Sequence, residues 1–221
     1  MESNPSPKKR PARSAPTRAA LVAAGFELLV ERPIDAIPID EVVKRAGVAK
    51  GSFFNHFRDK QDFASAIGVE VRVELEQLVS RANAPLSDPV ERIANGLRVA
   101  AEFALAQPKR TAVLLRSQGS STARDHPLTR GLREDIEAAC AEGQLRPEAL
   151  SSGVLYWLGL CQVVMATLVA QGQTRDKRPA LVREMLVLGL SGLGVAPERA
   201  AVIAASREKR PTAGTAATRR Q

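Results

Sequence analysis

The chain is poor in the residues that build disulfide frameworks, metal centres and catalytic sites. Its 221 residues include two cysteines, two histidines, one tryptophan and one tyrosine, and aromatic residues make up 4% of the total. Cys140 and Cys161 both lie in apolar stretches with helical spacing, so we expect free thiols and a cytoplasmic location. His56 and His126 lie in different parts of the chain, and no metal-ligand cluster, phosphate-binding loop or nucleophile elbow accompanies them. We therefore expect no metal, no cofactor and no enzymatic activity.

Scarce aromatic residues and abundant Ala, Leu and Val favour helices over β-sheets. The length suits one or two domains with a sizeable core. No apolar segment follows the basic start of the chain, which argues against a signal peptide. The net charge of +8 is concentrated at the two ends, because residues 1–16 carry +3 and residues 207–221 carry +4. We expect a disordered basic arm (1–15) and a disordered basic tail (206–221), which either contact a polyanion such as nucleic acid or only aid solubility.

The most informative pattern begins at residue 39. Ile39, Val42, Val43 and Ala46 fall at i, i+3, i+4 and i+7, which is the spacing of one apolar face of a short helix. Gly47 follows directly, and glycine best tolerates the left-handed backbone that ends many helices. The sequence therefore predicts a helix that stops in a tight turn.

A second short helix is expected from about Lys50. Phe53 and Phe57 are four residues apart and share its buried face, whereas Gly51 and Asn55 point the opposite way. Two short helices joined by a tight turn form a helix-turn-helix, and a second helix with a small, polar outer face can enter the major groove of DNA.

These residues carry a family resemblance. The segment AGVAKGSFFNHFRDK resembles the motif A-G-V-[ST]-x-G-[ST]-x-[YF]-x-H-F-x-x-K of the tetracycline-repressor-like (TetR) family. The resemblance covers residues 17 to about 205, with its specific motifs confined to residues 17–63. It implies an all-α dimeric regulator with a three-helix, helix-turn-helix DNA-binding domain (16–62). A helical ligand-binding and dimerisation domain (63–205) follows it.

The resemblance also implies a set of residues at the DNA. Asn55 is expected to reach base edges, and the other members are expected to position the DNA backbone. The expected DNA-binding residues are Thr17, Lys50, Gly51, Ser52, Phe54, Asn55, His56 and Lys60.

Three positions depart from the family pattern. Ala49 stands where Ser or Thr usually caps the recognition helix, and Pro38 stands where Thr usually caps the preceding one. Phe54 replaces the commoner Tyr, which removes a hydroxyl that could contact phosphate. These changes weaken the expected DNA contacts without changing the binding mode.

Capping residues and prolines predict the remaining helices. Thr17 is placed to cap a first helix that ends at about Arg32, before Pro33. Asp59 is placed to cap a long helix to about Ala82, which would connect the DNA-binding and ligand-binding parts. Further helices are expected at 89–106, 108–118, 127–142, 147–170, 179–195 and 197–206.

The most apolar stretch is residues 154–170. Its 17 residues are at the short margin for a membrane span, which needs about 20. We interpret it as a helix buried on one side by its own domain and on the other by a second subunit. With the apolar helix at 179–195, it predicts a homodimer through residues 151–195. A charge at Leu186 or Leu190 is expected to give monomers, aggregates or unfolded chain.

A small apolar or amphipathic effector is expected among the helices of residues 88–170. Pocket candidates are polar or aromatic side chains that interrupt apolar helices. They are Asn95, Arg98, Arg116, Gln118, Tyr156, Trp157 and Gln162.

The favoured function is that of a homodimeric, sequence-specific DNA-binding regulator. We expect it to be a repressor that a small molecule releases from a near-palindromic operator of double-stranded DNA. One alternative is a helical small-molecule binding protein without specific DNA binding. A membrane-associated protein is a third interpretation, although we expect no membrane partner.

Overall fold

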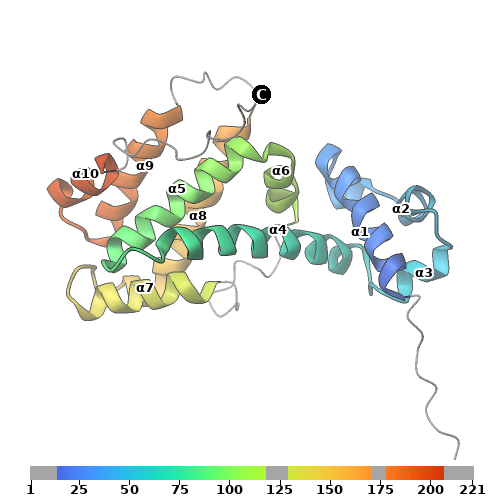
Figure 1. Cartoon of the computed structure of the whole chain (residues 1–221), viewed down its shortest axis with the longest axis horizontal. Helices are drawn as coiled ribbons and strands as arrows, with labels where there is room; N and C mark the ends of the chain where they lie inside the picture. The colour runs from blue at the N-terminus through green and yellow to red at the C-terminus, as the bar shows by residue number, and fades with distance from the viewer. Residues whose placement is uncertain (1–13, 118–128, 171–177, 207–221) are drawn as a thin grey trace, which may run out of the picture.

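A computed structural model describes residues 14–117, 129–170 and 178–206, and every regular element in these ranges is a helix (Figure 1). The expected all-α fold is confirmed. The elements are α1 (Ser14–Glu31), the 3-10 turn η1 (Ile34–Ala36), α2 (Ile39–Ala46), α3 (Lys50–Phe54), α4 (Lys60–Asn83), α5 (Pro89–Ala106), α6 (Pro108–Arg116), α7 (Arg130–Ala141), α8 (Ala149–Val169), α9 (Arg178–Leu193) and α10 (Pro197–Ala205). The predicted loop at 119–127 and the two basic ends lie outside the described residues.

Helix α1 lies against α2, α4 and α6. Its Leu21, Leu28 and Leu29 are fully buried, as the apolar spacing predicts. Gly25 lies at the crossing with α4, where an added Cβ would come within 2.2 Å of the Phe63 ring. Only glycine therefore lets the two helices approach this closely.

The start of α1 differs from the expectation. The helix begins at Ser14, so Thr17 lies inside its first turn and is not its cap. The predicted end is confirmed, since the helix stops at Glu31, two residues before Pro33. The capping pattern misplaced the start because Ala15 and Pro16 are compatible with a first helical turn, where proline is tolerated.

Helices α2 and α3 form the predicted helix-turn-helix. Val42 and Val43 are buried on the inner face of α2, and Gly47 ends it with a φ of 67°. The Val48 N–H then donates to the Val43 carbonyl across the turn, at 3.0 Å. As the sequence predicts, neither Pro38 nor Ala49 gives its helix a side-chain cap.

Helix α4 is the 24-residue element that connects the two ends of the molecule (Figure 1). The Asp59 carboxylate accepts from the Asp62 N–H at 2.7 Å, and the Asp62 carboxylate accepts from the Arg58 N–H at 3.0 Å. This nearly reciprocal cap begins α4 at the predicted place. One end of α4 lies beside α1 and η1, next to the helix-turn-helix, and the other packs on α5.

Helices α5, α6, α7 and α8 lie around the far part of α4, whereas α9 packs on α5 and α8, and α10 packs on α9 and α5. Asp88 caps α5 by accepting from the Val90 N–H at 2.8 Å, as the Asp-Pro pair predicts. Within the described residues, α8 is the helix long and apolar enough to cross a membrane. It contacts α5, α6, α7 and α9, so it packs as the core helix of this bundle. Cys161 on α8 is buried and both cysteines are free thiols, as expected.

Candidate functional site

An aromatic cluster fixes the helix-turn-helix on α4. The Phe53 and Phe57 rings lie 5.2 and 4.8 Å from the Phe63 ring, in edge-to-face arrangements. The Arg18 guanidinium of α1 lies over the Phe57 ring, 5.5 Å from its centre. Each edge-to-face pair typically adds about 0.5–1.5 kcal/mol beyond the burial of its area. The orientation of α3 therefore depends on contacts with α1 and α4.

The outer face of α3 is open to solvent. Gly51, Phe54 and Asn55 are exposed, and 55% of the Phe54 surface is accessible. Ser52 and His56 are half-buried at the margins of this face. The helix is shorter than the motif suggests, because it ends at Phe54 and Asn55 is its C-terminal cap.

Charge on the predicted DNA-binding unit is balanced. Residues 14–62 contain seven Lys and Arg residues and seven Asp and Glu residues. Lys50 forms an ion pair with Asp40 at 2.8 Å, and Lys60 donates to the Asp35 carbonyl at 3.1 Å. Thr17 is half-buried within α1. All eight predicted DNA-binding residues thus belong to this unit or the start of α4, but their contacts with DNA stay a prediction.

A second candidate site is a pocket of about 470 Å³ among α4, α5, α7 and α8. This volume lies in the ordinary range for small-molecule sites. The expected segment, residues 88–170, omits one of its walls. Helix α4 contributes that wall, from Arg72 to Asn83, because it continues past the DNA-binding unit into the bundle.

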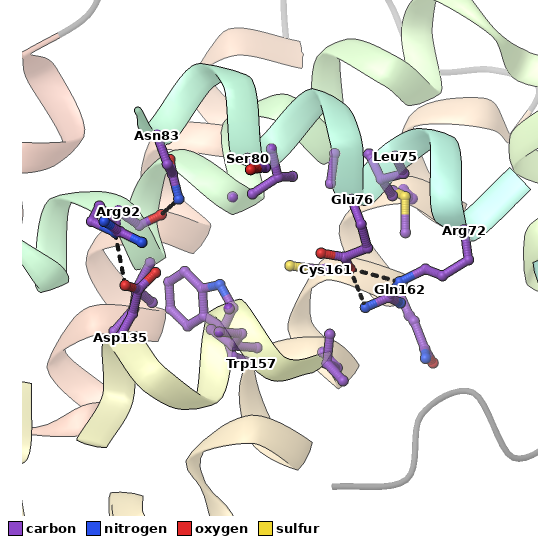
Figure 2. A pocket seen from close by; sticks show the side chains of 18 of the residues that line it. Arg72, Leu75, Glu76, Ser80, Asn83, Arg92, Asp135, Trp157, Cys161 and Gln162 are labelled. Carbon is purple, nitrogen blue, oxygen red and sulfur yellow. Dashed lines mark hydrogen bonds and ion pairs between the residues drawn. The ribbon is translucent and has the colours of Figure 1, made fainter. Parts of the chain in front are cut away.

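An ion pair stands at each end of the pocket (Figure 2). Arg72 Nη2 lies 2.7 Å from Glu76 Oε1 at one end, and Arg92 Nε lies 2.7 Å from Asp135 Oδ1 at the other. Burial raises the pKa of Glu76, with Arg72 opposing the shift. Burial likewise raises the pKa of Asp135 to about 6, although Arg92 opposes it. Both carboxylates are thus held at a desolvation cost that their arginines partly offset.

Trp157 lies between the two ion pairs, on the side of Arg92 and Asp135 (Figure 2). It is 1% exposed, and its indole N–H has no hydrogen-bond partner among the described residues. Cys161 lines the same wall, and burial raises the pKa of its thiol to about 12. That thiol stays protonated and unreactive at neutral pH.

The predicted pocket residues are dispersed. Trp157 and Gln162 line the pocket. Asn95 is fully buried behind it and donates to the Asn83 side chain at 2.7 Å. The Arg98 guanidinium donates to the carbonyl of Ile203 in α10.

The other three candidates lie away from these walls. The Arg116 guanidinium donates to the Leu29 carbonyl of α1 at 2.7 Å. The Tyr156 hydroxyl lies over Gly192 of α9, where an added Cβ would be 2.2 Å from it. Gln118 lies outside the described residues.

Sequence reasoning missed the four charged residues of the pocket, Arg72, Glu76, Arg92 and Asp135. Arg72 and Glu76 are four residues apart on a helix, which resembles an ordinary surface ion pair. The available signal was position, since Arg72 directly follows the apolar Val71 and lies three residues before the apolar Leu75. Arg72 is in fact only 5% exposed.

A third feature is an exposed apolar face on α8 and α9, which lie against each other. Leu155 and Val163 of α8 and Leu188 of α9 are 66%, 58% and 64% exposed. Leu186 and Leu190 are instead buried in the protomer's own core, at 1% and 0%. A charge at either residue would therefore enter the protomer core, so among the expected outcomes of monomers, aggregates or unfolded chain, burial favours unfolding.

Comparison with known proteins agrees with this geometry. Residues 21–67 match the model of the bacterial regulatory proteins of the tetR family. Over 71 residues the chain is 38% identical to the transcriptional regulator AcuR of Cereibacter sphaeroides, which covers 28% of this chain and 32% of that protein. The match therefore spans about a third of this curated relative.

Solved structures share the fold over most of the chain. A candidate tetR family transcription regulator from Shewanella sp. PV-4 is 18% identical, with a TM-score of 0.69 over 81% of this chain and 99% of that one. RolR in complex with the ligand resorcinol is 22% identical, with a TM-score of 0.57 over 89% of this chain and 96% of that one. The chain is therefore similar to the tetR family of bacterial regulatory proteins in sequence over its helix-turn-helix part, and it shares the fold of the solved structures over most of its length.

Proposed function

We propose that this protein is a homodimeric transcriptional repressor that leaves its operator when a small molecule occupies the pocket among α4, α5, α7 and α8. The DNA-binding residues of the proposal are those expected from the motif. The outer face of α3, with exposed Gly51 and Asn55, is small and polar enough for a major groove. Lys50 and Lys60 flank it and would contact phosphates.

The observation that carries the proposal is the continuity of α4. Near its start, Phe63 holds the recognition helix through Phe53 and Phe57. Near its end, the segment from Arg72 to Asn83 forms one wall of the pocket. A ligand that repositions this wall therefore acts on the same rigid element that orients α3.

A second contact links the two parts. The Arg116 guanidinium of α6 donates to the Leu29 and Val30 carbonyls at the end of α1. Arg110 of α6 forms an ion pair with Glu74 of α4 and lies over the Phe26 ring of α1, 5.7 Å from its centre. Movement of α4 would therefore be transmitted to α1 as well as to α3.

The exposed apolar face of α8 and α9 supports the homodimer. Exposed Leu188 follows the half-buried Leu181 and Met185 at i, i+4 and i+7 along α9, and exposed Leu155 and Val163 lie eight residues apart on α8. Large exposed apolar faces usually mark interaction surfaces. A second copy of this chain presents the same face, and a two-fold axis would bring the two together as a four-helix contact.

The test is a mobility-shift titration with the DNA upstream of the protein's own gene. We expect a shifted complex at physiological salt that survives excess nonspecific competitor DNA, and a footprint with two-fold symmetry. Binding that competitor removes completely would contradict the proposal. That result would favour a helical small-molecule binding protein in which the helix-turn-helix serves only as a scaffold.

A further inference from the structure

Both arginines of the pocket are already neutralised. Nε and Nη2 of Arg72 each lie 2.7 Å from the same carboxylate oxygen of Glu76. At the other end, Arg92 Nε lies 2.7 Å from Asp135 Oδ1. The two ends therefore present dipoles of paired charges, with no net charge in this part of the pocket.

The space between the two ion pairs is mostly apolar. Leu75 and Val79 of α4 face it from one wall, and Ile93 of α5, Leu158 and Met165 of α8 line the others. Such walls favour a ligand body that gives up little hydration on entry.

Trp157 supplies the unmatched polar atom. Its Cζ3 and Cη2 edge lies on Gly189 of α9, where an added Cβ would be 2.9 Å from Cζ3. That edge is remote from Nε1, so the packing on Gly189 directs the indole N–H away from α9. The residue is 1% exposed, and the N–H has no hydrogen-bond partner among the described residues. An indole N–H can only donate, so what it lacks is an acceptor.

We propose that the effector of the pocket is an uncharged molecule with an apolar body and a carbonyl or hydroxyl oxygen that accepts a hydrogen bond from Trp157 Nε1. The inference rests on the proposed function, because it names the ligand class of that same pocket. A carboxylate or an ammonium group would lose its hydration here without gaining a free counter-charge. An uncharged acceptor loses less hydration free energy on entering the pocket, and it can accept the hydrogen bond of the Trp157 indole N–H.

The test uses four probes with one phenylalkyl body. They are 4-phenyl-2-butanone (a neutral acceptor), 4-phenylbutyrate (an anion), 4-phenylbutylamine (a cation) and butylbenzene (no acceptor). Titration calorimetry with the full chain and without DNA measures each affinity. Trp157 is the only tryptophan of the chain, so its fluorescence reports occupancy of the pocket independently.

We expect the ketone to bind at least roughly tenfold more tightly than each of the other three probes. Trp157→Phe keeps an aromatic ring but removes the N–H, and it should weaken ketone binding by roughly tenfold while leaving butylbenzene unchanged. Equal or tighter binding of the anion or cation overturns the inference. So does an unchanged ketone affinity in the variant, or the absence of binding by all four probes.

A second variant keeps the test decisive if Trp157→Phe does not fold. Glu76→Gln removes the partner of Arg72 and exposes an uncompensated cation in the pocket. We expect 4-phenylbutyrate to gain at least roughly tenfold in affinity. Glu74→Gln, on the same helix but paired with Arg110 outside the pocket, is the matched control and should gain nothing. No gain in Glu76→Gln contradicts the neutralised-pocket argument.

These measurements contain no DNA, so their failure is distinguishable from failure of the proposed function. If a charged effector released the protein from its operator, only the inferred ligand class would be wrong, and the proposed regulatory function would stand. Loss of specific operator binding would overturn the regulatory function while leaving the calorimetry interpretable.

Discussion

Asn55 is the exposed polar side chain at the end of the recognition helix α3. Asparagine can form two hydrogen bonds with adenine in the major groove. We expect Asn55→Ala to weaken binding to the operator by about 1–3 kcal/mol and to relax the preference at one base position. Fluorescence anisotropy with singly substituted duplexes measures both effects.

Lys60→Ala is the control for this prediction, since a phosphate contact carries no base information. It should weaken binding to operator and random DNA alike. An unchanged affinity and base preference in Asn55→Ala would show that α3 enters the groove in another orientation.

Ala49 has the extended backbone of an N-terminal cap, with φ −71° and ψ 148°. Its side chain has no oxygen that could accept a hydrogen bond from the first N–H groups of α3. Ala49→Ser should supply an acceptor for the free N–H groups of α3 and stabilise the protein by about 0.5–2 kcal/mol. Thermal unfolding measures the gain. Ala138→Ser, at an exposed position inside α7, should instead destabilise slightly, because serine is a poorer helix former than alanine. Equal melting temperatures for wild type and Ala49→Ser would mean that another group already caps α3.

Asp135 gives the protein a specific pH dependence. Burial raises its pKa from 3.8 to about 6, so between these values the folded protein binds more protons than the unfolded chain. The contribution of Asp135 to the free energy of unfolding therefore falls as pH rises from about 4 to 6. Asp135→Asn removes this contribution. We expect the stability difference between variant and wild type to change across that range, as measured by denaturant unfolding. A constant difference would place the pKa near its ordinary value.

At the scale of whole elements, α8 differs from the other described helices in exposing several large apolar side chains, and α9, which lies against it, adds Leu188. Leu188→Glu places a charge in the proposed dimer contact while leaving the protomer core untouched. We expect monomers that keep their helical circular dichroism, and weak operator binding. Leu105→Glu is a matched control on α5, where the leucine is 41% exposed but lies off this face. Sedimentation that shows Leu188→Glu as a stable dimer would contradict the proposed contact.

Helix ends were predictable wherever one residue type determines the local geometry. Gly47, Pro33, Asp59 and Asp88 each begin or end a helix near the expected residue. The start of α1 was not predictable from the sequence, because no distinctive capping residue marks its first turn. Local chemistry therefore predicts boundaries only where a side chain or a positive φ is required.

The charged residues of the pocket, in contrast to the helix ends, could not be predicted from the sequence. Arg72, Glu76, Arg92 and Asp135 come from three helices, and only their packing shows that the two ion pairs stand at opposite ends of one cavity. Polar interruptions of apolar helices predicted Trp157 and Gln162 but also Arg116, which contacts α1 instead. Helical spacing identifies which face is buried without identifying what covers it.

At the scale of the whole molecule, the distribution of positive charge bears on the affinity for DNA. The balanced charge of residues 14–62 contrasts with the basic residues Lys8, Lys9, Arg10 and Arg13, which lie outside the described residues. We expect these four to supply much of the electrostatic affinity for DNA. Each neutralised phosphate contributes about 0.9 to the slope of log affinity against log salt. Deleting residues 1–14 should lower that slope by several units per dimer and leave base preference largely intact. An unchanged slope and low-salt affinity would mean that this segment does not contact DNA.

The proposed dimeric, operator-specific binding of the whole molecule can be tested in one titration. The protein is added to the full footprinted operator, to a duplex with one half-site and to a scrambled duplex, with anisotropy for affinity and light scattering for stoichiometry. We expect two protomers per operator and binding to the half-site about 100-fold or more weaker, because two linked recognition helices bind together. A single protomer on the operator, or equal affinity for operator and scrambled DNA, would contradict the proposed function.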